Sequence, residues 1–319
     1  MTTNKKEKTT GKPKIDRWIW TVPALIILTV ISHLIIYSRP GGMTGVLLYY
    51  LGALVICFFA FVFLVIGLIV SRKKKPYFNR WRTLGFISLL SFLVLYVVRA
   101  DHSGNYFDAY PSSHDKEISP VHFRLPFDSL IAVGWGGGES SVNYHVSAPD
   151  QCWAYDLLRF NNGKTYSGDS LILDNYFCYG IPVLAPANGL VVATNDTAPD
   201  TPIGSMGDLT NLLGNYIIIQ VAPHQYLFLC HLKPKSIKVV KGDTIIQRQP
   251  LALVGNSGHS SEPHLHMHLQ DTPTISFGEG IPLYFYNYYA DGKFVKRGIP
   301  TGGIDAKGTF IGQTVWDIQ

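Results

Sequence analysis

One short stretch of the sequence alternates histidine with apolar residues, and this alternation constrains the local conformation strongly. His264, His266 and His268 are separated by Leu265 and Met267. In an extended strand, side chains two positions apart share a face, so the histidines lie on one face and the apolar residues on the other. Imidazole binds metals and transfers protons near neutral pH. The stretch therefore predicts a strand with either a metal or catalytic site on its histidine face, or a solvent-facing polar edge.

Further short apolar runs predict that residues 121–319 form a mainly antiparallel β domain. These runs are rich in β-branched and aromatic residues and cover residues 181–184, 189–193, 216–221, 226–231 and 251–254. Such runs between glycine, proline and asparagine turns are typical of an all-β sandwich or barrel. Residues 291–319 either complete the sheet or cover the cleft. Residues 196–210 form either a binding loop or an insertion without a role.

Three apolar segments precede this domain, at residues 18–37, 47–70 and 81–98. Each is long enough, as a helix, to cross the hydrocarbon core of a bilayer. We therefore expect an all-α membrane segment of three transmembrane helices over residues 17–98. A disordered cytoplasmic tail, residues 1–16, precedes it, and a linker, residues 99–120, follows it.

The distribution of charge predicts how these segments are oriented. Lysine and arginine cluster in the N-terminal tail and between the second and third segments, although the net charge of the chain is only +5. The positive-inside rule places both clusters in the cytoplasm, and three crossings then place the β domain outside it. The expected location is the cell membrane, with several passes and an extracytoplasmic C-terminal domain. The clustered charge is not a signal for nucleic acid, and no nucleic acid partner is expected.

Two residues outside the histidine row are further candidates. Asp156 lies in an otherwise apolar run, where an unpaired charge would be costly, so it is either a metal ligand or a partner of Arg159. His231 ends an apolar run at a strand-to-loop corner and is either a site residue or a structural histidine. Strand alternation turns Cys230 to the opposite face from His231. The turns that follow fold the next strands back and bring residues 264–268 towards His231.

Several motifs, in order along the chain, resemble the lysostaphin-type (LytM-like) zinc endopeptidases that cut peptidoglycan peptides. The motifs are residues 180–191, Gly214-Asn215-Tyr216, His231-Leu232, Lys241-Gly242-Asp243, Gly255-Asn256-Ser257-Gly258 and Pro263-His264-Leu265-His266. The resemblance implies a compact antiparallel β domain and a Zn²⁺ cofactor. It also implies that Asp156 and His266 are zinc ligands and that His231 and His264 are catalytic. His268 has no counterpart in the family pattern and either supports a ligand or is solvated.

The sequence departs from the family at one position of its H-x-x-x-D motif. Cys152, not histidine, stands four residues before Asp156. Either the Cys152 thiolate or the nearby His145 then completes the ligand set. We favour His145, because a hydrolytic site suits imidazole and carboxylate ligands and an exported thiolate would be exposed to oxidation.

The implied function is that of a membrane-anchored zinc metalloendopeptidase that hydrolyses peptide bonds of bacterial peptidoglycan outside the cytoplasm. The expected partner is a peptidoglycan peptide or another extracytoplasmic peptide. The alternative is a catalytically inactive lysostaphin-type domain that binds the cell wall or regulates another protein. The broken H-x-x-x-D motif favours this alternative, whereas the histidine and aspartate residues that remain oppose it.

Overall fold

The structure is a computed structural model of the whole chain. It describes residues 27, 31, 34–35, 38–52, 62, 109–205, 207, 209–305 and 309–318. The chain divides into two compact units, of which the second comprises Ser38–Val46 and Asp101–Gln319 and contains the β domain. The first unit comprises Met1–Tyr37 and Leu47–Ala100.

The N-terminal part corrects the membrane prediction. The two elements whose bounds the structure describes there are a short α-helix, α2 (Gly42–Leu47), and a π-helical turn, Leu48–Gly52. Six helical residues rise about 9 Å, far less than the roughly 30 Å of a hydrocarbon core. The part of the chain that the structure describes contains no helix long and apolar enough to span a bilayer. The predicted three transmembrane helices and multi-pass membrane location are therefore wrong. The rest of residues 17–98 lies almost wholly outside the described residues.

The physical reason for this error is that the prediction counted apolar residues and did not test helix continuity. α2 begins at Gly42, after Gly41 with a φ of 74°, and ends at Leu47, the first residue of the predicted second span. The backbone then becomes π-helical at Leu48. An apolar run supplies the side chains of a span, but crossing also needs an unbroken helix of about 20 residues.

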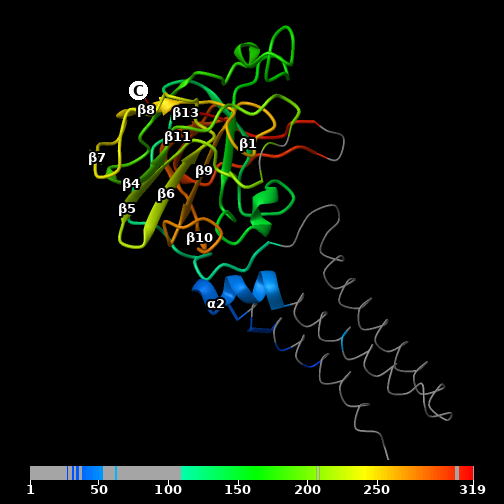
Figure 1. Cartoon of the computed structure of the whole chain (residues 1–319), viewed down its shortest axis with the longest axis vertical. Coiled ribbons are helices and arrows are strands. Elements are labelled where there is room, and N and C mark those ends of the chain that lie inside the picture. Colours follow the sequence, from blue (N-terminus) through cyan, green and yellow to red (C-terminus); the bar gives the residue numbers. More distant parts are fainter. Residues whose placement is uncertain are drawn as a thin grey trace, which may run out of the picture. The chain divides into compact units, whose positions relative to one another are not determined.

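The β domain is confirmed, and it is built around an antiparallel sheet of eleven strands (Figure 1). The main path runs in the order β12, β11, β13, β1, β2, β9, β6, β5, β4 and β7, with β10 paired to β9. These strands are β1 (Ile131–Trp135), β2 (Tyr155–Leu158), β4 (Gly189–Asn195), β5 (Tyr216–Ala222), β6 (Gln225–Cys230), β7 (Thr244–Ile245), β9 (Leu265–Gln270), β10 (Gly280–Ile281), β11 (Phe285–Ala290), β12 (Lys293–Gly298) and β13 (Thr314–Asp317). A second, two-stranded sheet pairs β3 (Pro182–Leu184) with β8 (Pro250–Leu253).

The C-terminal residues complete the sheet, which answers the question that the sequence left open. β13 lies between β1 and β11 and pairs antiparallel with both. Val315 stands opposite Ile131 on one side and Ala290 on the other. All three side chains are buried, so the end of the chain contributes to the core.

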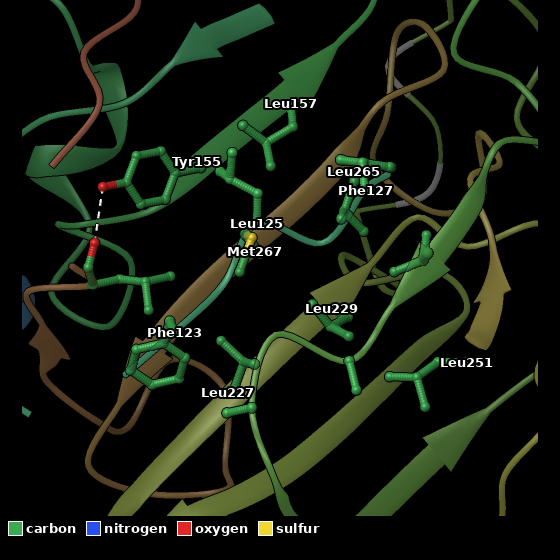
Figure 2. Close-up of a cluster of buried hydrophobic side chains, with 14 of the residues drawn as sticks. Phe123, Leu125, Phe127, Tyr155, Leu157, Leu227, Leu229, Leu251, Leu265 and Met267 are labelled. Atoms are coloured by element: carbon green, nitrogen blue, oxygen red, sulfur yellow. Dashed lines mark hydrogen bonds between the residues drawn. The ribbon is translucent and has the colours of Figure 1, made fainter. Parts of the chain in front are cut away.

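The main hydrophobic core lies on the apolar face of β9 (Figure 2). Met267 is fully buried and stands opposite Tyr155 of β2 and Leu229 of β6. Leu265 stands opposite Leu157 in the same way. Full burial of such a side chain contributes about 1.5–3 kcal/mol. The register of β9 is therefore fixed, because a slip of one residue would place its histidines in this core.

Candidate metal centre

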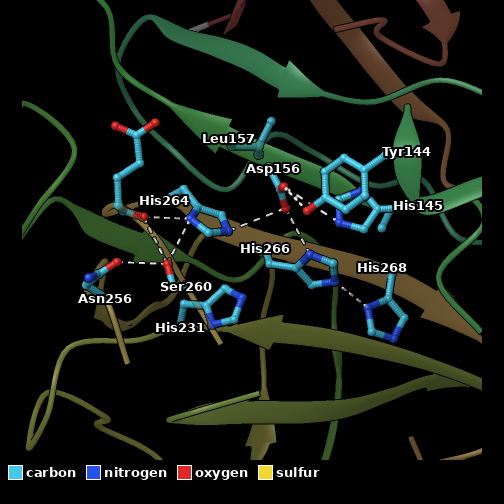
Figure 3. A network of polar contacts seen from close by, with 12 residues as sticks. Tyr144, His145, Asp156, Leu157, His231, Asn256, Ser260, His264, His266 and His268 are labelled. Carbon is cyan, nitrogen blue, oxygen red and sulfur yellow. Dashed lines mark hydrogen bonds and ion pairs between the residues drawn. The ribbon is translucent and has the colours of Figure 1, made fainter. Parts of the chain in front are cut away.

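The opposite face of β9 carries the histidines, and Asp156 is at the centre of their contacts (Figure 3). Asp156 on β2 stands directly opposite His266 on β9, so their side chains share a face. The Oδ1 atom of Asp156 lies 2.9 Å from Nδ1 of His266 and 3.5 Å from Nε2 of His264. The Oδ2 atom accepts a 3.0 Å hydrogen bond from Tyr144 and lies 3.6 Å from Nε2 of His145. One buried carboxylate therefore contacts three imidazoles and a phenol.

His145 reaches this carboxylate from a short 3₁₀ helix, Tyr144–Ser147. Asn143 caps the helix, and its Oδ1 accepts hydrogen bonds from the backbone N–H of His145 and from Nδ1 of the His145 ring, at 3.1 and 2.9 Å. The Asn143 amide group is itself fixed, because Nδ2 donates to the carbonyls of Gly137 and Ala154. With the proton on Nδ1, the lone pair of Nε2 is directed towards Asp156.

Cys152, the other candidate ligand, does not lie with Asp156 and His266. Its Sγ is 3.9 Å from the carbonyl oxygen of Gly280, and the side chain is buried. Burial raises the pKa of the Cys152 thiol well above its usual value, so the group is a neutral thiol. The structure therefore brings His145, and not Cys152, together with Asp156 and His266.

Arg159 does not pair with Asp156. Its guanidinium Nε points instead to the carbonyl oxygen of Leu130, at 3.5 Å. The alternative in which a salt bridge to Arg159 explains the buried aspartate is therefore wrong.

His231 faces the same centre through an unusual backbone conformation. Cys230, the last residue of β6, stands opposite His266 and so lies on the histidine face of the sheet. Strict alternation would turn His231 to the other face, but His231 has a φ of 59°. Its ring centroid consequently lies 4.8 Å from that of His264 and 5.8 Å from that of His266. The expectation that Cys230 faces away from the site is therefore wrong.

Both candidate catalytic histidines are anchored through Nδ1. His231 donates to the carbonyl of Ser257 at 2.8 Å, and His264 donates to the carbonyl of Glu262 at 2.8 Å. Ser260 lies 3.2 Å from Nδ1 of His264 and adds a second contact. Each ring therefore keeps Nε2 as its acceptor nitrogen.

The loop that follows β4 holds His231 in place. The backbone N–H of His231 donates to the carbonyl of Leu213, and Asn215 Nδ2 donates to the next carbonyl, that of Leu232. This loop also packs tightly on the turn at residues 255–258, since a Cβ on Gly258 would lie 2.3 Å from the backbone nitrogen of Gly214. Residues 213–215 at the end of this loop therefore support the site.

Burial disfavours the charged form of three imidazoles in and beside this centre. It lowers the pKa of His145 to about 3 and the pKa values of His231 and His268 well below 6.5. Burial alone would raise the pKa of Asp156, but the imidazoles of His145, His264 and His266 outweigh it and hold that pKa below its usual value. The centre thus combines one carboxylate with several imidazole nitrogens.

His268 and Gln270 continue the polar row along β9. Nε2 of His266 lies 3.0 Å from Nδ1 of His268, and Nε2 of His268 lies 3.0 Å from Oε1 of Gln270. His268 is fully buried and its ring stacks on Phe228, so a solvated His268 is excluded. Gln270 was not a sequence candidate, although the same period of two that relates the histidines leads to it.

The residues present fit a zinc ion. One nitrogen or oxygen atom from each of His145, Asp156 and His266 lies within 4.8 Å of the others, and all three side chains are buried. The 3.6 Å between Nε2 of His145 and Oδ2 of Asp156 is too long for a hydrogen bond. It is close to the roughly 3.4 Å that separates two donors on one tetrahedral zinc. Two imidazoles and one carboxylate form a donor set found in catalytic zinc sites.

A second group of metal-binding residue types, His114, Asp271 and Glu279, lies outside this centre. Nδ1 of His114 lies 2.5 Å from Oε2 of Glu117, and its Nε2 lies 3.6 Å from Oδ2 of Asp271. The interaction with Asp271 raises the pKa of His114 to about 9, against the opposing effect of burial. A protonated His114 supplies the positive charge among these carboxylates, so an ion-pair network accounts for the group.

One protein-family model matches part of this domain. Residues 173–276 match the model of Peptidase family M23, which confirms the resemblance to the lysostaphin-type peptidases. Members of this family are typically zinc metallopeptidases, and the match implies a metallopeptidase domain related to peptidoglycan. The matched stretch contains His231, His264 and His266, whereas His145 and Asp156 precede it. No curated protein sequence matches the chain.

Solved structures that match parts of this chain include three proteins, each 19% identical to it. A mutant catalytic domain of the prophage-encoded M23 protein EnpA from Enterococcus faecalis has a TM-score of 0.33, with 50% of this chain and 93% of that chain covered. The catalytic domain of lysostaphin from Staphylococcus simulans has a TM-score of 0.28, with 47% and 86% covered. A zinc-containing peptidase from Vibrio cholerae has a TM-score of 0.30, with 51% and 40% covered.

Proposed function

We propose that this chain is a zinc metalloendopeptidase that hydrolyses peptide bonds of bacterial peptidoglycan. The observation that carries the proposal is the buried convergence of His145, Asp156 and His266, with His231 and His264 beside them. The match of residues 173–276 to Peptidase family M23 supports the reaction and the class of substrate. The proposed partner is a peptidoglycan peptide.

In this proposal, Nε2 of His145, a carboxylate oxygen of Asp156 and Nδ1 of His266 hold the zinc ion. When bound, zinc supplies Lewis acidity for water and for the scissile carbonyl. Asn143 orients His145 through its ring Nδ1, which is the usual way a buried acceptor fixes the tautomer of a metal-binding histidine. The buried carboxylate of Asp156 balances part of the charge of the ion.

His231 and His264 transfer protons and stabilise the charge that develops during hydrolysis. A neutral imidazole with Nδ1 anchored to a backbone carbonyl accepts a proton at Nε2. The resulting imidazolium donates that proton, or a hydrogen bond, to the oxygen or nitrogen of the scissile peptide group that gains negative charge. General acid–base catalysis of this kind contributes on the order of a hundred- to ten-thousandfold. The two rings are close enough to serve one substrate, with 4.8 Å between their centroids.

Hydrolysis that depends on zinc tests this function. The purified full-length chain is incubated with peptidoglycan peptides, and the products are identified by mass spectrometry. We expect cleavage that a metal chelator abolishes and that added zinc restores, because the proposed chemistry needs the ion. The same chelator saturated with zinc before use is the control and leaves cleavage unchanged. A chain that binds zinc but cuts no peptidoglycan peptide would contradict the proposal and favour an inactive cell-wall binding domain.

A further inference from the structure

Three polar side chains on one face of β9 form a continuous row behind the candidate metal centre. His266, His268 and Gln270 follow one another at intervals of two residues, and the two contacts between them each measure 3.0 Å. His268 and Gln270 are fully buried. Water therefore has no access that would let it replace either contact.

Gln270 sets the direction of these hydrogen bonds. Its Nε2 amide donates to the carbonyls of Thr272 and Thr274, at 2.6 and 3.1 Å. Its Oε1 is consequently the atom that faces His268, and this oxygen only accepts hydrogen bonds. Nε2 of His268 must therefore carry the proton.

The position of this proton then determines the direction of the hydrogen bond between His268 and His266. A neutral His268 has one N–H, so with the proton on Nε2 its Nδ1 is an acceptor. Nε2 of His266 faces this acceptor at 3.0 Å and must donate to it. With Nε2 as the donor to His268, Nδ1 is the nitrogen of His266 left for the centre, where it lies 2.9 Å from Oδ1 of Asp156. As a zinc ligand, Nδ1 would carry no proton. Phe228 stacks on the His268 ring, with 4.5 Å between centroids, and holds it in the plane that these contacts need.

We propose that His268 and Gln270 are positioning residues that fix the tautomer and the ring orientation of His266, so that Nδ1 is presented to the metal. This inference rests on the proposed zinc site. Gln270 acts on His268, and His268 acts on His266, while neither touches the ion or the substrate. Acceptors that orient a metal-binding histidine typically change metal affinity by about 10- to 100-fold when removed.

Zinc affinity, measured by competition with a chelator on the metal-free full-length chain, tests the proposal with a matched pair of substitutions. Asparagine and leucine have similar volumes, but only asparagine offers an oxygen near the position of the histidine Nδ1. We expect His268→Leu to weaken zinc binding by about 10- to 100-fold. His268→Asn should restore most of the affinity. Gln270→Leu should weaken binding in the same direction, because it removes the oxygen that accepts from His268.

A second measurement separates positioning from a general loss of structure. Nitrogen-15 spectra of the histidine-labelled, zinc-loaded chain should show His268 protonated on Nε2 and unprotonated on Nδ1. The thermal midpoints of the metal-free Leu and Asn variants should agree, since the difference between them acts through the metal. If the wild-type chain binds zinc and the His268→Leu variant binds it equally well, this inference is overturned but the proposed function is not. The same holds if the wild-type chain binds zinc and His268 is protonated on Nδ1. A wild-type chain that binds no zinc would overturn the proposed function as well.

Discussion

Replacement of Asp156 by asparagine is expected to abolish zinc binding and peptide hydrolysis together. The substitution keeps the size of the side chain but removes the charge that lies within 3.6 Å of the ring nitrogens of His145, His264 and His266. Without the carboxylate, only neutral donors remain to hold a divalent cation in a buried site. We expect zinc affinity to fall by at least about a hundredfold, and hydrolysis to be lost with it.

A matched control for this variant is Asp150→Asn. Asp150 is also buried, but its carboxylate accepts a backbone hydrogen bond from Ser276 and is not one of the three grouped donor residues. The control should keep its zinc and its activity. Elemental analysis and a hydrolysis assay on the same samples give both readouts. Retention of full zinc content by Asp156→Asn would show that Asp156 is not a ligand.

Replacement of His231 by alanine is expected to separate metal binding from catalysis. Nδ1 of His231 is anchored to the carbonyl of Ser257, and the ring lies beside His264 outside the proposed ligand group. Loss of one acid–base group lowers turnover by about a hundred- to ten-thousandfold. We therefore expect a decrease of this size in kcat with close to the wild-type zinc content.

His224→Ala is the control for this variant, because His224 is exposed in the turn between β5 and β6. It should change neither kcat nor zinc content. If His231→Ala loses its zinc along with its activity, His231 is a ligand and the proposed division of roles is wrong. Unchanged turnover would exclude a catalytic role for His231.

The β domain could be predicted from local patterns because the alternation of apolar and polar residues shows which side chains of a strand are buried. In β9, Leu265, Met267 and Leu269 had to face the core, and this requirement alone placed His266 and His268 on the other face. The resemblance to known peptidases then implied Asp156 as the partner of His266, and the two residues stand opposite each other in the sheet. The predicted strands at 189–193, 216–221 and 226–231 correspond to β4, β5 and β6.

Other parts of the site depend on contacts that local patterns do not contain. His145 lies near Asp156 because Asn143 caps a 3₁₀ helix and bonds to the His145 ring. His231 faces the centre through a left-handed backbone conformation, which alternation does not predict. The buried partner of His268 is Gln270, whose amide direction is set by two carbonyls in the following loop.

The membrane prediction failed for a different reason. Hydropathy over a window of residues reports composition, and composition does not ensure a continuous helix. α2 ends at Leu47, where the second predicted span was expected to begin, and the next five residues are π-helical. The predicted membrane location depended on three crossings by those helices, so it is wrong for the same reason.

The zinc content of three forms of the full-length chain tests the central claim most directly. Wild type, His145→Ala and Cys152→Ser are purified together and analysed for metal by elemental analysis. The proposed site predicts about one zinc per chain in wild type and in Cys152→Ser, and little zinc in His145→Ala. Loss of zinc from Cys152→Ser with retention in His145→Ala would contradict the ligand set of His145, Asp156 and His266. Absence of zinc from all three forms would contradict the metal centre itself.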